Sequence, residues 1–449
     1  MLVTGVGMSK GLSIARAFYR QGHTVIAADF EPYMIPVCGR SSNAICRFYR
    51  LQKPTGEQAS GTRYVEGIID IVTREKADIW ISCSGVSSAV DDALAAETVE
   101  RQTSCKAIQF GVEITKTLHE KHTFIKQTEK FGLKVPQTLM IQSKDHAMRF
   151  FYDKWAAMRP LDRVEPSVRR EYILKPVGVE DSRRADMTIL PFEDSVETLY
   201  HLNKLEPAAH RPYVIQKFIQ GAEYCTHSLI VRGKVKAFTA CQSAELLMHY
   251  RALPINDPVL KEMLRYTQVY AHKMGEKATG HFSVDFMVDN VSEDAKLRDR
   301  LYPIECNPRA HTAVVLFEDI GKEMVDAYLS VVDKDEASMK TNGHAVEAAI
   351  AIPEEGRGYY WVGHDLVTRV LLPILNVLRL KSGIKVMILS WKEFADHVSN
   401  WKDGTFEVWD PWPFWALYVI YWPQMFLISI MTGSWWSRCN VSTTKMFRC

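Results

Sequence analysis

The sequence predicts an α/β protein with three parts, and three observations indicate this division. Residues 1–112 alternate apolar strand-like runs with helical ones, the pattern of a Rossmann-like parallel sheet. Residues 113–332 open with a longer helical run and contain several strand-like runs with lysines or acids near their ends, which predicts a second domain. Residues 333–449 hold most of the 11 tryptophans and predict a mostly helical C-terminal extension.

The overall composition is that of an ordinary globular protein. The chain has 449 residues, of which 47% are hydrophobic, and a net charge of +2, so no clustered basic face predicts a nucleic-acid partner. The 9 cysteines are scattered without close metal-ligand spacing, which favours a reducing compartment. The first residues lack the basic region and apolar core of a secretory signal. We therefore expect a cytoplasmic location.

The N-terminal part opens with a strand, a glycine turn and a helix. Residues 2–4 form the expected strand, residues 5–11 the turn and residues 12–21 the helix, and a second strand at 24–28 ends in Asp29. This order imitates a dinucleotide-binding fingerprint, in which Asp29 could meet a ribose, although such turns also occur in domains that bind no nicotinamide. A third strand near 79–83 ends in small residues that could line a substrate crevice.

The central part begins with a long helix predicted over residues 114–131, closed by Gly132 and Pro136. Lys121 lies early in this helix. A second lysine, Lys175, ends an apolar strand at 172–175. An ammonium on such a strand needs an anion to offset the loss of its hydration, so Lys175 is a candidate ligand for a negatively charged group.

A strand, a short linker and a second strand follow at residues 213–224. The linker backbone could read the edge of an adenine, and Glu223 could accept hydrogen bonds from ribose hydroxyl groups. An ordinary β-hairpin is the alternative interpretation.

Two later strands carry acids. Asp285 lies in the middle of the strand at 282–288, and residues 303–309 place Glu305, Asn307 and Arg309 on one face of an extended segment. Magnesium prefers hard oxygen ligands completed by substrate phosphates, and arginine suits a bidentate contact to a carboxylate or phosphoryl group. A metal shared by these acids would also remove the cost of burying Asp285. A strand end with a salt bridge is the simpler alternative.

This ordered set of residues resembles the ATP-grasp superfamily of ligases over about residues 1–330. The resemblance implies ATP phosphate contacts from Lys121 and Lys175, and an arginine, Arg309, that orients the carboxylate being activated. It also implies ATP and one or two Mg²⁺ ions, with Mn²⁺ as an alternative. In that family the adenine would be held by Gln216, Lys217, Phe218 and Ile219, the ribose by Glu223, and the metal by Asp285, Glu305 and Asn307. The resemblance makes residues 1–112 a preATP-grasp domain, which explains the glycine turn without NAD. It makes residues 113–332 the two-lobed α+β catalytic domain.

The chain also departs from the family pattern. Glu120 stands where aspartate is common, and Gln216 stands where glutamate is common. The glycine-rich phosphate loop expected after Lys175 is replaced by residues 178–186, in which Ser182, Arg183 and Arg184 could contact phosphate or form a surface salt-bridge cluster.

The implied activity is ATP-dependent formation of a C–N bond. A carboxylate, or an enolate, would be phosphorylated to an acyl or enol phosphate, and an amine such as an amino acid would displace the phosphate. The C-terminal features are similar to those of fungal natural-product ATP-grasp enzymes and of the mycosporine-glycine-ligase-like branch, which implies secondary-metabolite biosynthesis. Candidate substrate contacts are Glu245, His249 and Arg251. A catalytically inactive ATP-binding module and an NAD(P)-dependent oxidoreductase remain alternatives.

The C-terminal extension contains two further features. His364 and Asp365 precede an apolar helical run, where Asp365 is expected to cap the helix. Residues 409–431 are nearly uncharged and about long enough to cross a bilayer. Pro423 and the clustering of tryptophans in the first half favour core packing, or an aromatic lid over the ATP cleft, with membrane attachment as the alternative. The oligomeric state is left open.

Overall fold

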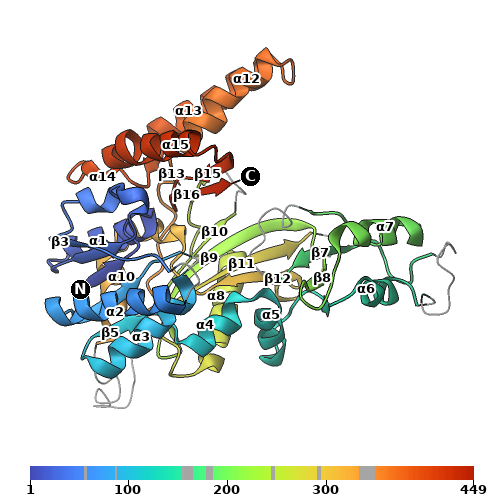
Figure 1. The fold of residues 1–449 in the computed structure, drawn as a ribbon, viewed down its shortest axis with the longest axis horizontal. Helices are drawn as coiled ribbons and strands as arrows, with labels where there is room; N and C mark the ends of the chain where they lie inside the picture. Colours follow the sequence, from blue (N-terminus) through green and yellow to red (C-terminus); the bar gives the residue numbers. More distant parts are fainter. Residues whose placement is uncertain are drawn as a thin grey trace. The chain divides into compact units, whose positions relative to one another are not determined.

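The computed structural model describes residues 1–54, 58–85, 88–153, 155, 165–177, 186–243, 248–290, 295–332 and 349–448. The chain forms two compact units. Figure 1 labels their helices and strands. Unit 1 comprises Met1–Lys116, Tyr224–Val284 and Asn307–Cys449, and unit 2 comprises Thr117–Glu223 and Asp285–Cys306.

Unit 1 begins with a parallel five-stranded sheet of order β3-β2-β1-β4-β5. The central strand β1 aligns Leu2 with Ile26 of β2 on one side and with Trp80 of β4 on the other. The strands are β1 (Leu2–Thr4), β2 (Ile26–Asp29), β3 (Arg47–Arg50), β4 (Ile79–Ser82) and β5 (Lys106–Ile108). The connecting helices are α1 (Ser9–Arg20), α2 (Gln58–Glu75) and α3 (Ala89–Gln102). The predicted Rossmann-like alternation is confirmed here.

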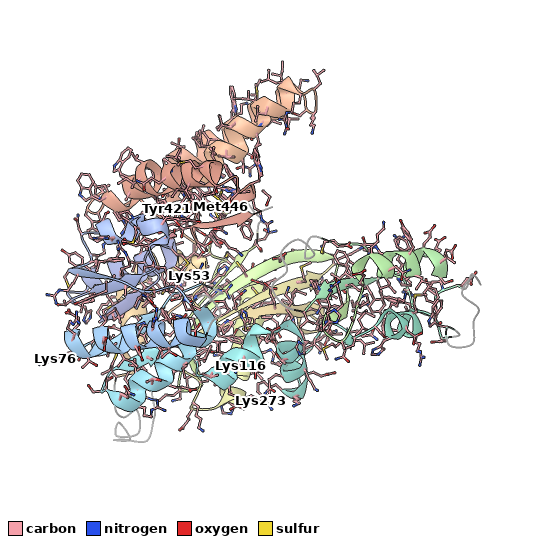
Figure 2. All side chains as sticks on the ribbon, in the orientation of Figure 1. Lys53, Lys76, Lys116, Lys273, Tyr421 and Met446 are labelled. Atoms are coloured by element: carbon pink, nitrogen blue, oxygen red, sulfur yellow. The ribbon has the colours of Figure 1, made fainter. Side chains whose placement is uncertain are left out.

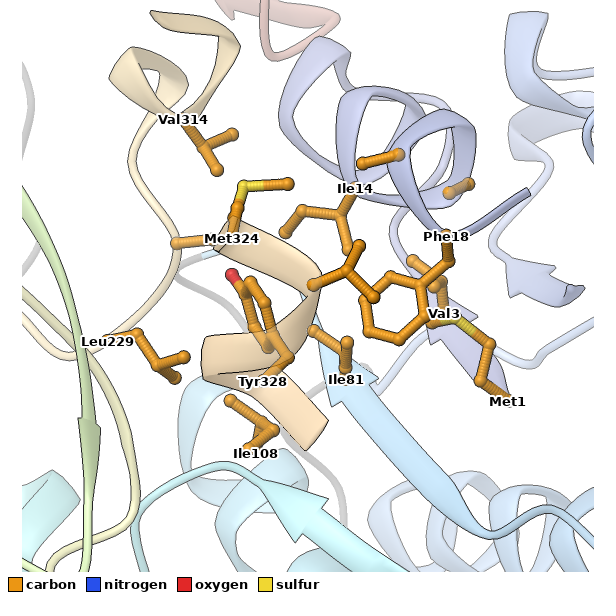
Figure 3. Packing of buried hydrophobic residues seen from close by; sticks show 14 of the residues in the cluster. Met1, Val3, Ile14, Phe18, Ile81, Ile108, Leu229, Val314, Met324 and Tyr328 are labelled. Carbon is orange, nitrogen blue, oxygen red and sulfur yellow. The ribbon is translucent and has the colours of Figure 1, made fainter. Parts of the chain in front are cut away.

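A hydrophobic core joins this sheet to later segments of unit 1 (Figure 3). Ile14 and Phe18 of α1 pack with Val3, Met324 and Tyr328, all of them buried. The later segments are η5 (Thr312–Ile320) and α10 (Gly321–Leu329). Residues more than 300 positions apart in the sequence thus share one core, because burying apolar surface is the dominant favourable term in folding.

A second, four-stranded sheet has the order β10-β9-β11-β12. Its strands are β9 (Gly221–Val231), β10 (Lys234–Gln242), β11 (Gly280–Asp289) and β12 (Leu301–Asn307), with α8 (Pro258–Met274) packed on β10 and α9 (Leu297–Arg300) preceding β12. β9, β11 and β12 each contribute residues to both units.

Unit 2 contains an antiparallel three-stranded sheet of order β6-β8-β7. The strands are β6 (Thr138–Ile141), β7 (Tyr172–Pro176) and β8 (Tyr213–Lys217), and the helices are α5 (Lys121–Lys130), α6 (Lys144–Phe151) and α7 (Ser195–Leu205). Ser143 and Asp194 begin α6 and α7, where each side chain accepts a hydrogen bond from a backbone N–H group in the first turn.

The single helix predicted over residues 114–131 is wrong. It is two helices, α4 (Val112–His119) and α5, separated by Glu120 in an extended conformation (φ −85°, ψ 121°). The Thr123 hydroxyl lies within hydrogen-bond distance of the carbonyl oxygens of Thr117 and Glu120 and can satisfy groups that the break leaves without helical partners. The break places Lys121 at the first position of α5.

The C-terminal extension is mostly helical, as predicted. Its elements are β13 (Tyr359–Tyr360), α11 (Val362–Asp365), η6 (Leu366–Leu371), α12 (Leu372–Leu378), α13 (Ile384–Asn400), β14 (Lys402–Asp403), α14 (Trp412–Trp415), η7 (Ala416–Tyr421), α15 (Trp422–Met431), β15 (Trp436–Asn440) and β16 (Lys445–Arg448). Tyr421 and Met446, labelled in Figure 2, belong to a cluster that packs this extension against Ile35 and Val37 near the first sheet.

Candidate functional site

Unit 2 brings Lys121 to Glu305. Lys121 begins α5, and Glu305 lies on β12, 184 positions later in the sequence. Their side chains form an ion pair and are each about one-third exposed. The partial exposure leaves both groups accessible to a ligand from solvent.

Lys175 is the second lysine of this group. Its Nζ donates a hydrogen bond to Oε1 of the buried Gln216 at 2.9 Å, from the neighbouring strand β8. Burial and, second, the charge of Lys121 lower the pKa of Lys175, Glu305 and Glu223 oppose the fall, and the net pKa is about 8. The two lysines and two glutamates therefore lie in one electrostatic neighbourhood, although the sequence separates them widely.

The linker between β8 and β9 is partly fixed by the chain itself. Phe218 N–H donates to the Glu171 carbonyl at 2.7 Å, and the Lys217 ammonium pairs with the Glu171 carboxylate at 3.2 Å. Ile219 is buried. A Cβ on Gly221, the first residue of β9, would lie 1.7 Å from the Val288 carbonyl oxygen, so this position requires glycine.

The predicted metal ligands lie on two neighbouring strands. Asp285 lies on β11 and Glu305 on β12, both are partly buried, and both belong to unit 2. Asn307 ends β12 two residues after Glu305 and belongs to unit 1. Carboxylate and amide oxygens are the ligand types that Mg²⁺ and Mn²⁺ accept.

Arg309 lies in unit 1, in the turn that follows β12. Its N–H donates to the Asn307 carbonyl at 2.8 Å, and its carbonyl accepts from the Ser283 hydroxyl at 3.0 Å. The position of its backbone is thus set by β12 and β11 together.

Lys10 is a residue that sequence analysis missed. Its ammonium is buried and donates to the carbonyls of Ser84, at 3.2 Å, and Ala310, at 3.0 Å. Burial and, second, the Arg309 charge lower its pKa, and the net pKa is about 7. The sequence did offer a signal, because Lys10 stands inside the glycine turn of residues 5–11. In the structure it contacts Ser84, one of the small residues that follow the third strand.

Three histidines surround the same region of unit 1. Burial first, and the Lys10 charge second, lower the pKa of His281 and of His311 to about 3. Burial also holds the pKa of His227 well below its usual range. His227 Nδ1 accepts from His311 N–H at 3.2 Å, and His281 Nε2 lies 2.7 Å from the Tyr328 hydroxyl. These imidazoles are neutral at pH 7, so they add no positive charge beside Lys10 and Arg309.

The glycine turn engages Asp29 internally. Gly7 N–H donates to Asp29 Oδ2 at 2.6 Å, and Phe30 N–H donates to Oδ1 at 2.7 Å. Burial raises the pKa of Asp29 to about 6. This carboxylate holds the turn in place, which weakens its candidacy as a ribose ligand.

The structure describes two of the three predicted substrate contacts, His249 and Arg251. Glu245 lies outside the described residues, as do Ser182, Arg183 and Arg184 of the expected phosphate loop. Arg251 and His249 both flank the Trp401 ring, with Arg251 5.9 Å above it and the His249 ring 5.6 Å away, edge-on.

The interpretation of Asp365 as a helix cap is wrong. Its carboxylate is completely buried and faces two imidazoles, with Oδ1 2.8 Å from His249 Nε2 and Oδ2 2.6 Å from His397 Nδ1. Although burial opposes the change, these contacts lower the pKa of Asp365 below its usual value. Since an imidazole faces each oxygen, Asp365, His249 and His397 form one internal polar cluster.

A cavity of about 450 Å³ lies elsewhere in unit 1, and none of the predicted site residues lines it. Several of its charged lining residues are paired: Lys402 contacts Glu318 and Glu407, and Arg16 contacts Asp410, which lies outside the lining. The cavity is therefore not the predicted ATP site.

Comparisons with known proteins bear on the fold. No protein-family model matches the sequence, and no curated protein matches it. Among solved structures, a variant of Rhizobium etli pyruvate carboxylase is similar with a TM-score of 0.50 at 13% identity, covering 80% of this chain and 29% of that chain. The phosphoribosylamine–glycine ligase of Thermotoga maritima has a TM-score of 0.47 at 14% identity, covering 80% and 78%.

An L-amino acid ligase from Bacillus licheniformis has a TM-score of 0.44 at 14% identity, covering 69% of this chain and 66% of that chain. At such identities the likeness concerns the fold alone. The match with a TM-score of 0.50 agrees with the N-terminal parallel sheet and the antiparallel sheets described above. The chain therefore has the ATP-grasp fold.

Proposed function

We propose that the protein is an ATP-dependent ligase that joins a carboxylate, or an enolate, to an amine by forming a C–N bond. The observation that carries this proposal is the meeting of Lys121, Lys175, Glu223 and Glu305 in unit 2. Two cations beside two carboxylates suit a ligand that carries phosphates, a metal ion and ribose hydroxyl groups.

Each residue has a role in this proposal. The ammonium groups of Lys121 and Lys175 hold ATP phosphates, and Glu223 accepts hydrogen bonds from the ribose. Because Phe218 N–H is already bonded to Glu171, an adenine edge would be read by other backbone groups of residues 216–219.

Asp285, Glu305 and Asn307 are the residues that would hold Mg²⁺, or alternatively Mn²⁺, since their oxygens fit these ions. A bound ion would neutralise charge on the phosphates. The ion pair between Lys121 and Glu305 keeps the carboxylate compensated without a metal.

The substrates are proposed by chemistry only. Arg309 would orient the carboxylate or enolate. Lys10 lies close enough to Arg309 for the two charges to interact, and with a pKa of about 7 its protonated form would add a second positive charge there. The amine is proposed to be an amino acid, and the pathway to be secondary-metabolite biosynthesis in the cytoplasm. His249 and Arg251 remain proposed substrate contacts. Residues 1–112, 113–332 and 333–449 remain the proposed domains.

The test is ADP release by the full chain with ATP and Mg²⁺, screened with pooled carboxylic acids and cyclohexenones against pooled amino acids. We expect substrate-dependent ADP release that disappears in Glu305→Gln, while Glu206→Gln, which breaks a surface ion pair with Arg211 in the same unit, keeps it. A folded Glu305→Gln variant with normal turnover would refute the assignment of the site.

The two alternatives give different results in the same experiment. An inactive ATP-binding module would bind ATP in calorimetry and release no ADP with any pair of substrates. An oxidoreductase would bind NAD(P) through the glycine turn, but Asp29 is already bonded to Gly7 and Phe30.

A further inference from the structure

A helical hairpin of unit 1 leaves its apolar side chains in solvent. η6 and α12 run outward, and α13 packs back against both of them (Figure 1). In these three elements, every residue of which the structure describes, only His397 is buried. The hairpin therefore forms no hydrophobic core of its own.

The exposure is greatest at the tip of the hairpin. Leu378 is 73% exposed, Leu380 is 93% exposed and Ile384 is 60% exposed. Apolar side chains are also exposed along the rest of η6, α12 and α13. They are Leu366, Val367, Leu371, Leu372, Leu375, Val386, Ile388, Leu389, Trp391 and Val398. A contiguous apolar surface of this kind marks an interaction site.

The segment Trp412–Met431 adds a second apolar surface. Ala416, Leu417, Tyr421 and Trp422 are buried in the core of unit 1, so one side of this helical segment is held by protein. The opposite side is exposed at helical spacing and comprises Trp412, Trp415, Val419, Leu427 and Ile430. The segment is long and apolar enough to cross a membrane, but only 28% of its most apolar window is buried in the protein. A helix held on one side by the core suits a position along a bilayer surface better than one across it.

Most charges of the hairpin are positive, and its two acids, Glu393 and Asp396, lie in the last turns of α13. Residues 366–392 contain five basic residues and no acid, and residues 411–434 contain no charged residue. Arg369 pairs with Glu393, while Arg379, Lys381, Lys385 and Lys392 form no ion pair within the described parts of the chain. Four unpaired cations beside an apolar surface complement an anionic lipid leaflet. Apposing two copies of the hairpin would instead bring like charges together, which disfavours self-association.

We propose that the hairpin and the exposed side of Trp412–Met431 together form a docking surface for an anionic lipid bilayer, which the protein binds from one side without spanning it. The exposed tryptophans Trp391, Trp412, Trp415 and Trp435 suit the boundary between headgroups and acyl chains. The anionic leaflet faces the cytoplasm, so this docking is compatible with the proposed ligase.

The test is flotation of the full-length protein with lipid vesicles of two compositions. We expect binding to vesicles of phosphatidylcholine mixed with phosphatidylserine, weaker binding to phosphatidylcholine alone, and a loss of the difference at high salt. Lys381→Gln with Lys385→Gln should weaken binding to the anionic vesicles about 25-fold, at about fivefold per cation removed.

A second variant tests the apolar contact. Leu378→Glu with Leu380→Glu changes two exposed side chains, so circular dichroism should show an unchanged fold, while vesicle binding should fall more than about 10-fold. The matched control is Met187→Glu with Ile255→Glu, which adds the same charges at exposed apolar residues outside the hairpin and should bind normally.

Three results would overturn the proposal. They are absence of binding to either vesicle, equal binding by the tip variant and its control, and a dimer by light scattering that the tip variant converts to a monomer without vesicle binding. The last result would assign the surface to a second copy of the chain.

Discussion

Replacing Lys175 with methionine should stabilise unit 2 and weaken ATP binding at the same time. The pKa of this lysine falls from the ordinary 10.5 to about 8 because its ammonium is buried. A difference of this size is worth about 3 kcal/mol, at 1.36 kcal/mol per pKa unit. Because the residue keeps some access to solvent, we take about 2 kcal/mol as the cost that Lys175→Met removes.

The substitution also has a cost. It leaves Oε1 of the buried Gln216 without its 2.9 Å hydrogen bond, which is worth about 1 kcal/mol. At pH 7 we therefore expect the free energy of unfolding of unit 2 to be higher in Lys175→Met than in the wild-type protein by about 1 kcal/mol. If Lys175 contacts phosphate, the loss of a charged hydrogen bond should weaken ATP binding roughly 10- to 100-fold.

The pH dependence gives a signature that packing alone would not produce. A lysine whose folded pKa lies below its unfolded pKa destabilises the fold fully below about 8, and this penalty disappears as the pH rises toward 10.5. The wild-type protein should therefore gain stability relative to Lys175→Met between pH 7 and pH 9, by about 1 kcal/mol.

The measurement needs a probe inside unit 2, because unfolding of two compact units mixes their transitions. Trp155 is the one tryptophan that the sequence places in unit 2, so fluorotryptophan labelling gives a ¹⁹F resonance for this unit. Urea titrations at pH 7 and pH 9, with the exposed Lys126→Met as control, give the free energies of unfolding. A Lys175→Met variant that loses more than about 1 kcal/mol at pH 7, by an amount independent of pH, would refute the desolvation argument.

Three further predictions concern stability. Asp410→Asn should cost about 3–5 kcal/mol in thermal unfolding, because it leaves the buried Arg16 without its counterion, and a loss below about 1 kcal/mol would contradict this. Gly221→Ala should cost about 1–3 kcal/mol and speed hydrogen exchange at the start of β9, since its Cβ meets the Val288 carbonyl; unchanged exchange would argue otherwise. Asp365 has a lowered pKa, so its contribution to stability is present above about pH 4 and is lost as the pH falls below that value. Acid titrations of Asp365→Asn should accordingly start from a lower stability at neutral pH and fall less steeply in acid, and parallel wild-type and variant curves would count against this role.

The elements that could be predicted from the sequence are those fixed by local pattern. The strand, glycine turn and helix at the N-terminus are specified by apolar periodicity and by small residues within about 20 positions. The strand that contains Lys175 could be predicted from its local run of apolar residues in the same way.

The features that sequence reasoning missed depend on distant partners. The break at Glu120 is accompanied by side-chain contacts of Thr123, and no proline or glycine marks it. The residues that follow Asp365 in the sequence favour a helix cap at this position. Its actual partners, His249 and His397, lie 116 and 32 positions away, so the local pattern does not reveal them. The prediction that residues 409–431 pack into the core is right for one side of that segment only. The periodicity of a sequence shows that a helix has an apolar face, but it does not show what covers that face.

The contact between Asp365 and His397 also makes the hairpin a removable insertion. These two residues stand immediately before and after residues 366–396, and their side chains are bonded to each other at 2.6 Å. The chain thus leaves unit 1 and returns to it at nearly the same point, the arrangement in which an inserted segment can be exchanged for a short turn. A chain shortened in this way should keep its folded body and lose the exposed apolar side chains of the hairpin, while the exposed side of Trp412–Met431 stays in place. The contribution of each apolar surface to vesicle binding could then be measured separately.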